Sequence, residues 1–308
     1  MKASIIVPTY NRKERLKECV LALLNQNFKD YEIIVVDDGS SDGTKDMING
    51  LQKEHNNLRY LRQKNKGPGI ARNYGVSEAE GNIIALTDDD CIADSNWLKE
   101  IVNSFKDKKV GVVGGGYVFH ENPGLIGLWQ SCNVKRGIKE GRLRHPSFFE
   151  SNNLAMHKEV FLEVGGFNPL FGPKDGSEDF NLNYQTFKKG YKLVFNETAK
   201  VKHLHKLNLK GVLKQNYIAG RGDIVFMFIN KEKRIFKPYH FLLFPLIAFK
   251  KTIGQIKYTN KKYNFPVFYV LNFLGLLYHQ IGRCVRCIDI KKPSLFFYVA
   301  DKSVKESI

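Results

Sequence analysis

The sequence has few cysteines, and they form no disulfide framework. Five cysteines are spread over 308 residues without a repeated spacing. An odd number in such an arrangement argues against a secreted, disulfide-stabilised scaffold and for a reducing compartment. Cys284 and Cys287 have no second pair to complete a zinc site, so we do not expect zinc there.

The sequence also lacks several features that would define other classes of protein. The apolar run at residues 3–7 is too short for a signal peptide, and Pro8 follows it at once. We therefore expect the N-terminal domain to stay in the cytoplasm. There is no internal repeat and no low-complexity segment, and 43% hydrophobic with 26% charged residues is a globular composition.

Acidic residues are scarce in the last third of the chain. Residues 200–308 carry 21 Lys and Arg against 5 Asp and Glu, whereas residues 1–199 carry 27 against 26. The same third contains the apolar stretches Phe241–Phe249 and Phe265–Ile281. Basic charge combined with apolar stretches favours an anionic membrane surface, not nucleic acid, as the partner.

These apolar stretches are short for membrane-spanning helices. The longer one has 17 residues and contains Asn272, and the shorter one contains Pro245. We expect helices that lie in the membrane interface, with the lysines between the two stretches near anionic headgroups, namely Lys250, Lys251, Lys257, Lys261 and Lys262. Arg283 and Arg286 follow the second stretch. A buried helical pair packed on the catalytic domain is the alternative.

The N-terminal part alternates between predicted strands and helices. Short runs rich in Ile and Val predict strands at residues 3–7, 32–36, 82–86 and 110–113. Periodic apolar residues predict helices after Asn11, which we expect to cap the first one, and at residues 46–54 and 68–78. This order predicts an α/β fold with a doubly wound, mainly parallel sheet flanked by helices, and ligands at the carboxyl ends of its strands.

Polar residues follow three of these strands and should converge on one crevice. They are Pro8-Thr9-Tyr10-Asn11, Asp37-Asp38-Gly39-Ser40 and Thr87-Asp88-Asp89-Asp90. None is a glycine-rich loop that could cradle a dinucleotide pyrophosphate. Three consecutive carboxylates repel one another unless a cation neutralises them, and oxygen ligands suit Mg²⁺ or Mn²⁺. An acidic surface loop is the alternative.

A second acidic motif stands at the start of a predicted helix. Ser177 is a candidate cap, Glu178 and Asp179 follow it, and Gly190 is a candidate stop. We expect Phe180, Tyr184 and Phe187 to face the core. The helix dipole favours an ionised Asp179, which suits a general base, although acids are common in the first turn of any helix.

Together these motifs resemble glycosyltransferase family 2, the inverting enzymes with a GT-A fold. The resemblance covers roughly residues 1–225. It rests on residues 7–11, 36–40, Gly69-Ile70-Ala71-Arg72-Asn73, residues 87–90, Gly165-Gly166-Phe167 and Glu178-Asp179.

The resemblance implies a role for each matching position. It implies contacts to the donor and its nucleotide from Pro8, Thr9, Tyr10, Asn11, Asp37, Asp38, Gly69, Arg72, Asn73, Asp88 and Asp89. Asp38 would bind the base and Arg72 would approach the diphosphate. The implied metal ligands are Asp88, Asp90 and His203, with His205 as the rival histidine, and the implied catalytic pair is Glu178 and Asp179, with Asp179 as the base. Asn152, Asn153 and residues 165–167 would shape the acceptor side, and residues 215–222 would close over the donor.

The resemblance thus implies an inverting transferase that uses Mg²⁺ or Mn²⁺. It would move a sugar from a nucleoside-diphosphate sugar to a lipid-linked or polysaccharide acceptor at the cytoplasmic face of the membrane. We expect a nucleotide-sugar-binding half at 1–115, an acceptor and base half at 116–230, and a membrane-associating helical region at 231–308.

Two other functions stay open at this point. A nucleotidyltransferase could use a similar sheet, but the glycine- and arginine-rich signature loop that such an enzyme would normally have near its N-terminus is missing. A non-catalytic protein that binds sugar or lipid could share the fold, but we would expect it to have lost one of the acids.

Overall fold

The computed structural model describes residues 2–118, 124–129, 132, 149–204, 208–230, 243–256 and 265–289. The chain forms two compact units. The first contains a β-sheet and its covering helices, and the second is helical. The threefold division expected at residues 115 and 230 stays a prediction.

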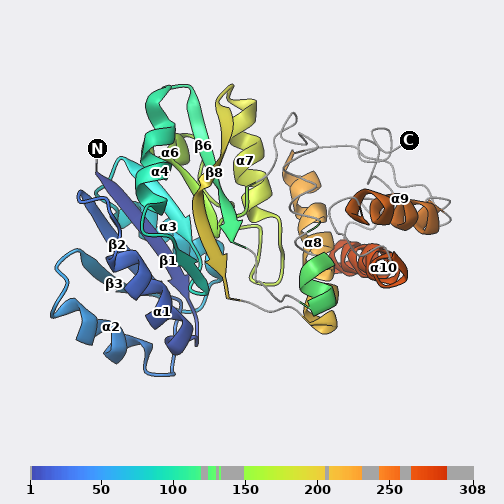
Figure 1. Cartoon of the computed structure of the whole chain (residues 1–308), viewed down its shortest axis with the longest axis horizontal. Helices are drawn as coiled ribbons and strands as arrows, with labels where there is room; N and C mark the ends of the chain where they lie inside the picture. The colour runs from blue at the N-terminus through green and yellow to red at the C-terminus, as the bar shows by residue number, and fades with distance from the viewer. Residues whose placement is uncertain are drawn as a thin grey trace. The chain divides into compact units, whose positions relative to one another are not determined.

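The first unit is built on an eight-stranded sheet in the order β3-β2-β1-β4-β7-β6-β8-β5 (Figure 1). β1 lies between β2 and β4 and is parallel to both, and β3 continues the parallel part beside β2. β7 is antiparallel to β4 and β6, while β8 is parallel to β6 and antiparallel to β5. The strands are β1 (Ala3–Thr9), β2 (Tyr31–Asp37), β3 (Leu58–Arg62), β4 (Ile83–Thr87), β5 (Cys91–Ala93), β6 (Val110–Val118), β7 (Asn153–His157) and β8 (Lys192–His203).

Helices cover both faces of this sheet because the central strands are apolar on both sides. Ile5 and Val7 pack against α1, α2 and α4, whereas Ile6 faces α3, α6 and α7. All three side chains are fully buried, and each contributes roughly 2 kcal/mol to stability. The helices are α1 (Lys13–Leu24), α2 (Thr44–Gln52), α3 (Pro68–Glu78), α4 (Trp97–Asn103), α6 (Lys158–Glu163) and α7 (Glu178–Lys188). The predicted α/β class with a mainly parallel sheet is confirmed.

Element boundaries mostly agree with the apolar pattern. α3 occupies the predicted residues, and each predicted strand is present within a few residues. α2 begins two residues earlier than predicted because Asp42 Oδ1 accepts hydrogen bonds from the backbone N–H and the hydroxyl of Thr44. Strand β3 escaped prediction because only Leu58 of its five residues is buried, so no apolar run marks it.

Two details of the predicted helices are wrong. Asn11 is not the cap of α1, because it has a φ of 51° and its side-chain oxygen accepts a hydrogen bond from the Ser41 N–H instead. Phe187 does not face the core but is 48% exposed. The buried face of α7 carries Leu182 and Asn183, whose amide bonds the backbone of Phe149.

The second unit contains α8 (Leu209–Asn230), α9 (Phe244–Ile256) and α10 (Phe265–Asp289). α8 and α10 touch backbone to backbone, since a Cβ on Gly220 would lie 1.9 Å from the His279 carbonyl oxygen. Arg221 of α8 and Arg286 of α10 both pair with the buried Asp175, at 3.0 and 2.8 Å. Among the described residues, no helix combines the length and the apolar character needed to cross a membrane.

Candidate active site

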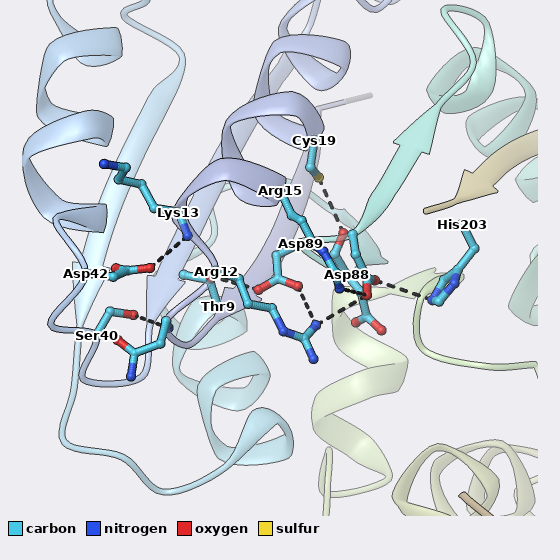
Figure 2. A network of polar contacts seen from close by, with 12 residues as sticks. Thr9, Arg12, Lys13, Arg15, Cys19, Ser40, Asp42, Asp88, Asp89 and His203 are labelled. Carbon is cyan, nitrogen blue, oxygen red and sulfur yellow. Dashed lines mark hydrogen bonds and ion pairs between the residues drawn. The ribbon is translucent and has the colours of Figure 1, made fainter. Parts of the chain in front are cut away.

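The acidic triplet lies where the sheet topology predicts a ligand site. Asp88, Asp89 and Asp90 form the turn between β4 and β5, beside the end of β1. Thr9, the last residue of β1, donates its hydroxyl to Asp89 Oδ2 at 2.8 Å (Figure 2). Two of the three predicted polar loops therefore meet through one hydrogen bond.

Two arginines from the start of α1 also reach the triplet. Arg12 Nη1 lies 2.9 Å from Asp89 Oδ1 and 3.3 Å from Asp90 Oδ2, and Arg15 Nη1 lies 3.7 Å from the same Asp90 oxygen. Burial raises the pKa of Asp89 to about 6, although the charge of Arg12 opposes the rise. Sequence reasoning missed both arginines. The signal was a pair of cations three residues apart at the start of a helix that follows a ligand-binding loop.

Asp88 is held by a different cation. Arg72 Nη2 lies 2.7 Å from Asp88 Oδ1, and the guanidinium stacks over the Phe167 ring at 5.4 Å. Arg72 is only 3% exposed, so its position is fixed by packing. Its neighbour Asn73 bonds the backbone of Phe167. The predicted donor residues of α3 and the Gly165–Phe167 motif thus share one cluster.

A nitrogen and an oxygen of the predicted metal set lie close together. His203 Nε2 is 3.4 Å from Asp90 Oδ1, which is buried and accepts no hydrogen bond in the described part of the chain. Strand pairing also places Cys91 opposite His203, and ligand atoms of Asp90, Cys91 and His203 all lie within 4.8 Å of one another. The third predicted ligand, Asp88, instead turns one oxygen to Arg72, and His205 lies outside the described residues.

The donor atoms at this position suit a hard or borderline cation. A buried carboxylate oxygen without a hydrogen bond and an imidazole nitrogen fit Mn²⁺ or Mg²⁺. The Cys91 sulfur does not add to that fit, because burial raises the pKa of its thiol and a thiolate prefers softer ions. Asp90 and His203 are therefore the residues that fit the expected ion.

The other predicted donor residues are mostly engaged inside the protein. Asp38 accepts hydrogen bonds from Gln63 Nε2 at 2.7 Å and from the Gly67 N–H at 2.8 Å. Asp37 accepts from the Ser40 N–H and the Tyr60 hydroxyl, at 2.7 and 2.6 Å. These carboxylates shape the loops after β2 and β3, and contact with a nucleotide base stays a prediction.

Three further predicted donor residues differ in how accessible they are. Pro8 is buried within β1, Tyr10 is 49% exposed, and Gly69 lies in the first turn of α3. Their contacts with the donor stay predictions.

Asp179 lies close enough to Arg72 and Asp88 to interact with their charges. Its Oδ1 accepts a hydrogen bond from the Phe180 N–H at 2.8 Å, and its Oδ2 accepts one from the Ser151 N–H at 3.2 Å. Desolvation raises the pKa of Asp179, the two hydrogen bonds and the charge of Arg72 oppose the rise, and the charge of Asp88 adds to it. Glu178 is the first residue of α7, and its catalytic role stays a prediction.

The two asparagines predicted near the acceptor are fastened to the protein itself. Asn153 Oδ1 accepts from Trp97 Nε1 at 2.8 Å, and its amide donates to the Gly116 carbonyl at 2.8 Å. Asn152 Oδ1 accepts from the Tyr117 hydroxyl at 2.6 Å. Residues 215–222 lie within α8 of the second unit, and their closure over a donor stays a prediction.

The sequence matches known glycosyltransferases over much of its length. The model of "Glycosyl transferase family 2" matches residues 4–167. Glycosyltransferase AglE of Haloferax volcanii is 30% identical over 227 residues, which is 72% of each chain. A Campylobacter jejuni protein named GalNAc(5)-diNAcBac-PP-undecaprenol beta-1,3-glucosyltransferase is 43% identical over 187 residues, or 59% of each chain.

A solved structure confirms the fold. The mannosyltransferase PcManGT from Pyrobaculum calidifontis, in complex with GDP-Man and Mn²⁺, superposes with a TM-score of 0.61 and 16% identity. The match covers 99% of this chain and 77% of that one. The fold is thus of the predicted GT-A type. With the family model matching more than half of its residues, the chain belongs to glycosyl transferase family 2 and is a glycosyltransferase.

Proposed function

We propose that this enzyme transfers a sugar from a nucleoside-diphosphate sugar to an acceptor hydroxyl, with inversion at the anomeric carbon. The observation that carries the proposal is the gathering of Asp88, Asp90, Arg72 and Asp179 within one unit at the carboxyl ends of the parallel strands. Cations for a leaving diphosphate and a base for a hydroxyl are the two requirements of this reaction. The GDP-mannose bound to the related fold supports the donor class.

The proposed cofactor is Mn²⁺ or Mg²⁺. Asp90 and His203 would hold the ion, with Asp88 beside them, and the ion would supply positive charge against the leaving diphosphate. Arg72 contributes a fixed positive charge at the same place, because Asp88 and the ring of Phe167 hold its guanidinium.

Asp179 is the proposed base. Two backbone N–H groups orient its carboxylate, and desolvation makes it a stronger proton acceptor than an exposed aspartate. It would take the proton of the acceptor hydroxyl as the oxygen attacks the anomeric carbon from the face opposite the diphosphate. One displacement assisted by a single base inverts the configuration.

The acceptor we propose is a lipid-linked glycan. The name of the Campylobacter relative describes a glycan on an undecaprenol diphosphate. An acceptor of this kind is anchored in a bilayer, so the enzyme must work at a membrane surface.

Helices α9 and α10 carry the pattern expected at such a surface. Their buried positions include polar side chains: Asn272 donates to Thr252 Oγ1 at 3.0 Å and to Gln255 Oε1 at 2.7 Å, and all three residues are at most 3% exposed. Their exposed positions are apolar, with Leu246 at 65% and Val270 at 50%. A helix pair with polar residues inside and apolar residues outside suits lipid surroundings.

Basic residues complete the proposed membrane surface. Lys250 and Lys251 follow directly on the exposed Phe249 of α9. Lysines at this place would meet anionic headgroups at roughly 1 kcal/mol each. The other predicted lysines, Lys257, Lys261 and Lys262, lie outside the described residues. The cytoplasmic face stays our expected location.

A screen of nucleotide sugars tests the proposed reaction. The full-length enzyme is incubated with a panel of UDP, GDP and dTDP sugars, a short polyprenyl-diphosphate glycan, and Mn²⁺ or a chelator. We expect one donor to give nucleoside diphosphate and an extended glycan only with the metal. Release of inorganic pyrophosphate in a parallel reaction with a nucleoside triphosphate and a sugar 1-phosphate would favour a nucleotidyltransferase. Binding of donor and acceptor without turnover would favour a non-catalytic protein.

A further inference from the structure

Arg12 places beside the acidic triplet a positive charge of the kind that a divalent cation would supply. One guanidinium nitrogen lies 2.9 Å from Asp89 Oδ1 (Figure 2) and 3.3 Å from Asp90 Oδ2. Both carboxylates are nearly inaccessible, with side chains 5% and 6% exposed. Ionised carboxylates in such a place need a positive charge close by.

Arg72 and Arg12, the two cations nearest the triplet, differ in how firmly the protein holds them. The Arg72 side chain is 4% exposed and stacks on Phe167, so the Asp88 pair is fixed. The Arg12 side chain is 48% exposed and extends from the residue that precedes α1. A half-exposed arginine exchanges a carboxylate for water, or for another anion, at little cost.

The Asp90 carboxylate would bind Arg12 less tightly while it binds a metal ion. Its Oδ1 faces His203, and its Oδ2 faces Arg12 at 3.3 Å and Arg15 at 3.7 Å. A divalent cation on this carboxylate would repel a guanidinium at that distance. The contact with Asp90 is the longer of the two that Arg12 makes, so it is the one that metal binding would weaken first.

We propose that Arg12 is a placeholder cation that metal binding displaces from Asp90 and that then binds the diphosphate of the donor. This inference rests on the proposed metal and donor. A guanidinium suits a diphosphate because its planar N–H groups pair with phosphate oxygens. Arg12 therefore opposes the metal when the enzyme is empty and assists the diphosphate once the metal is bound. It makes the binding of the two ligands cooperative.

The proposal predicts opposite effects of one substitution on two binding constants. Arg12→Gln removes the competing charge, so Mn²⁺ alone should bind at least several-fold more tightly. With Mn²⁺ saturating, UDP or GDP should bind about tenfold more weakly, as expected when one charged contact to a phosphate is lost. The factor by which Mn²⁺ strengthens diphosphate binding should be smaller in Arg12→Gln. The factor by which the diphosphate strengthens Mn²⁺ binding should fall equally, because the two factors are thermodynamically linked.

The experiment measures Mn²⁺ binding by electron paramagnetic resonance and UDP and GDP binding by calorimetry, with the full-length protein. Lys13→Gln is the matched control, because it removes the same charge one residue away, from a side chain that pairs with Glu14. Binding of Mn²⁺ and a diphosphate by the unmodified protein tests the proposed function separately. Mn²⁺ affinity no higher in Arg12→Gln than in Lys13→Gln would overturn the placeholder role. If Arg12→Gln binds the diphosphate as tightly as the unmodified protein does, Arg12 does not bind the diphosphate of the donor.

Discussion

Asn73 and Phe167 exchange two hydrogen bonds across 94 residues of sequence. The Asn73 amide donates to the Phe167 carbonyl at 2.7 Å, and its side-chain oxygen accepts from the Phe167 N–H at 2.9 Å. This exchange fixes the ring on which Arg72 stacks. The family resemblance implies that Asn73 contacts the donor. In this structure its side chain instead holds Phe167, on whose ring Arg72 stacks.

Replacing Asn73 by Ala should therefore lower stability and weaken donor binding together. Two hydrogen bonds at about 1 kcal/mol each give a loss of about 2 kcal/mol in the free energy of unfolding. The donor KM should rise because Arg72 loses its fixed position. Denaturant titration and steady-state kinetics measure the two effects. Asn82→Ala, at an exposed position, is the control, and a change in donor KM without a change in stability would contradict this account.

Asp179→Asn should leave donor binding intact and lower turnover by at least about a hundredfold, the usual contribution of a general base. The amide keeps the shape of the side chain but cannot take a proton. Calorimetry with a nucleoside diphosphate and single-turnover kinetics separate binding from chemistry. Asp46→Asn, on the exposed side of α2, is the control. Near-normal turnover in Asp179→Asn would remove this residue from the mechanism.

The pH dependence of turnover should report the environment of Asp179. Its pKa is raised by desolvation, so the carboxyl group binds a proton at a higher pH than an exposed aspartate at about 3.9. Only the ionised form can act as a base. The rate should thus fall as the pH drops through the raised pKa, and this acidic limb should disappear in Asp179→Asn. An unchanged acidic limb in that variant would assign it to another group.

Asp90→Ala should abolish metal-dependent binding of a nucleoside diphosphate. The substitution removes the buried oxygen that faces His203 and leaves the site without its central carboxylate. Calorimetry with UDP or GDP, with and without Mn²⁺, measures the effect. Asp94→Ala is the control, because Asp94 is exposed and lies outside the triplet. Unchanged affinity for the diphosphate in the presence of Mn²⁺ would rule out the metal assignment.

Local pattern predicted the parts of the site that follow directly from the strands. Residues 83–87 are buried on both faces, so their apolar run marks β4, and the rule for carboxyl ends then places Asp88 to Asp90 at the ligand edge. The meeting of Asp90 with His203 was implied by the family resemblance and not by local pattern. It depends on pairing between β5 and β8, which are over a hundred residues apart.

Long-range side-chain contacts were beyond the reach of local pattern. The long, flexible side chain of Arg12 can reach many partners. Its contact with Asp89 and Asp90 depends on how α1 packs beside the β4–β5 turn, which local pattern does not specify. The face of α7 was assigned from its aromatic residues, but the structure buries Asn183 because the backbone of Phe149 needs its amide. At α7, tertiary hydrogen bonds and not hydrophobicity alone decide which face is buried.

The exposed apolar face of α9 gives the last prediction. Leu246 and Phe249 are 65% and 47% exposed, while Thr252 and Gln255 of the same helix are fully buried. Burying an exposed side chain of this size in lipid is worth roughly 1.5–3 kcal/mol. The full-length protein should therefore sediment with vesicles that contain anionic lipid, and salt should weaken only the electrostatic part of the binding.

Changing both residues in Leu246→Glu/Phe249→Glu should lower vesicle affinity by about tenfold or more, because two apolar contacts are lost and two charges repel the headgroups. The control is Leu162→Glu on α6, an apolar side chain that is 59% exposed but belongs to the sheet unit. Turnover of a short, water-soluble acceptor should be the same in all three proteins, whereas turnover of a vesicle-bound acceptor should fall only in the α9 variant. If the unmodified chain stays in solution with anionic vesicles at low salt, the apolar face of α9 does not bind a membrane.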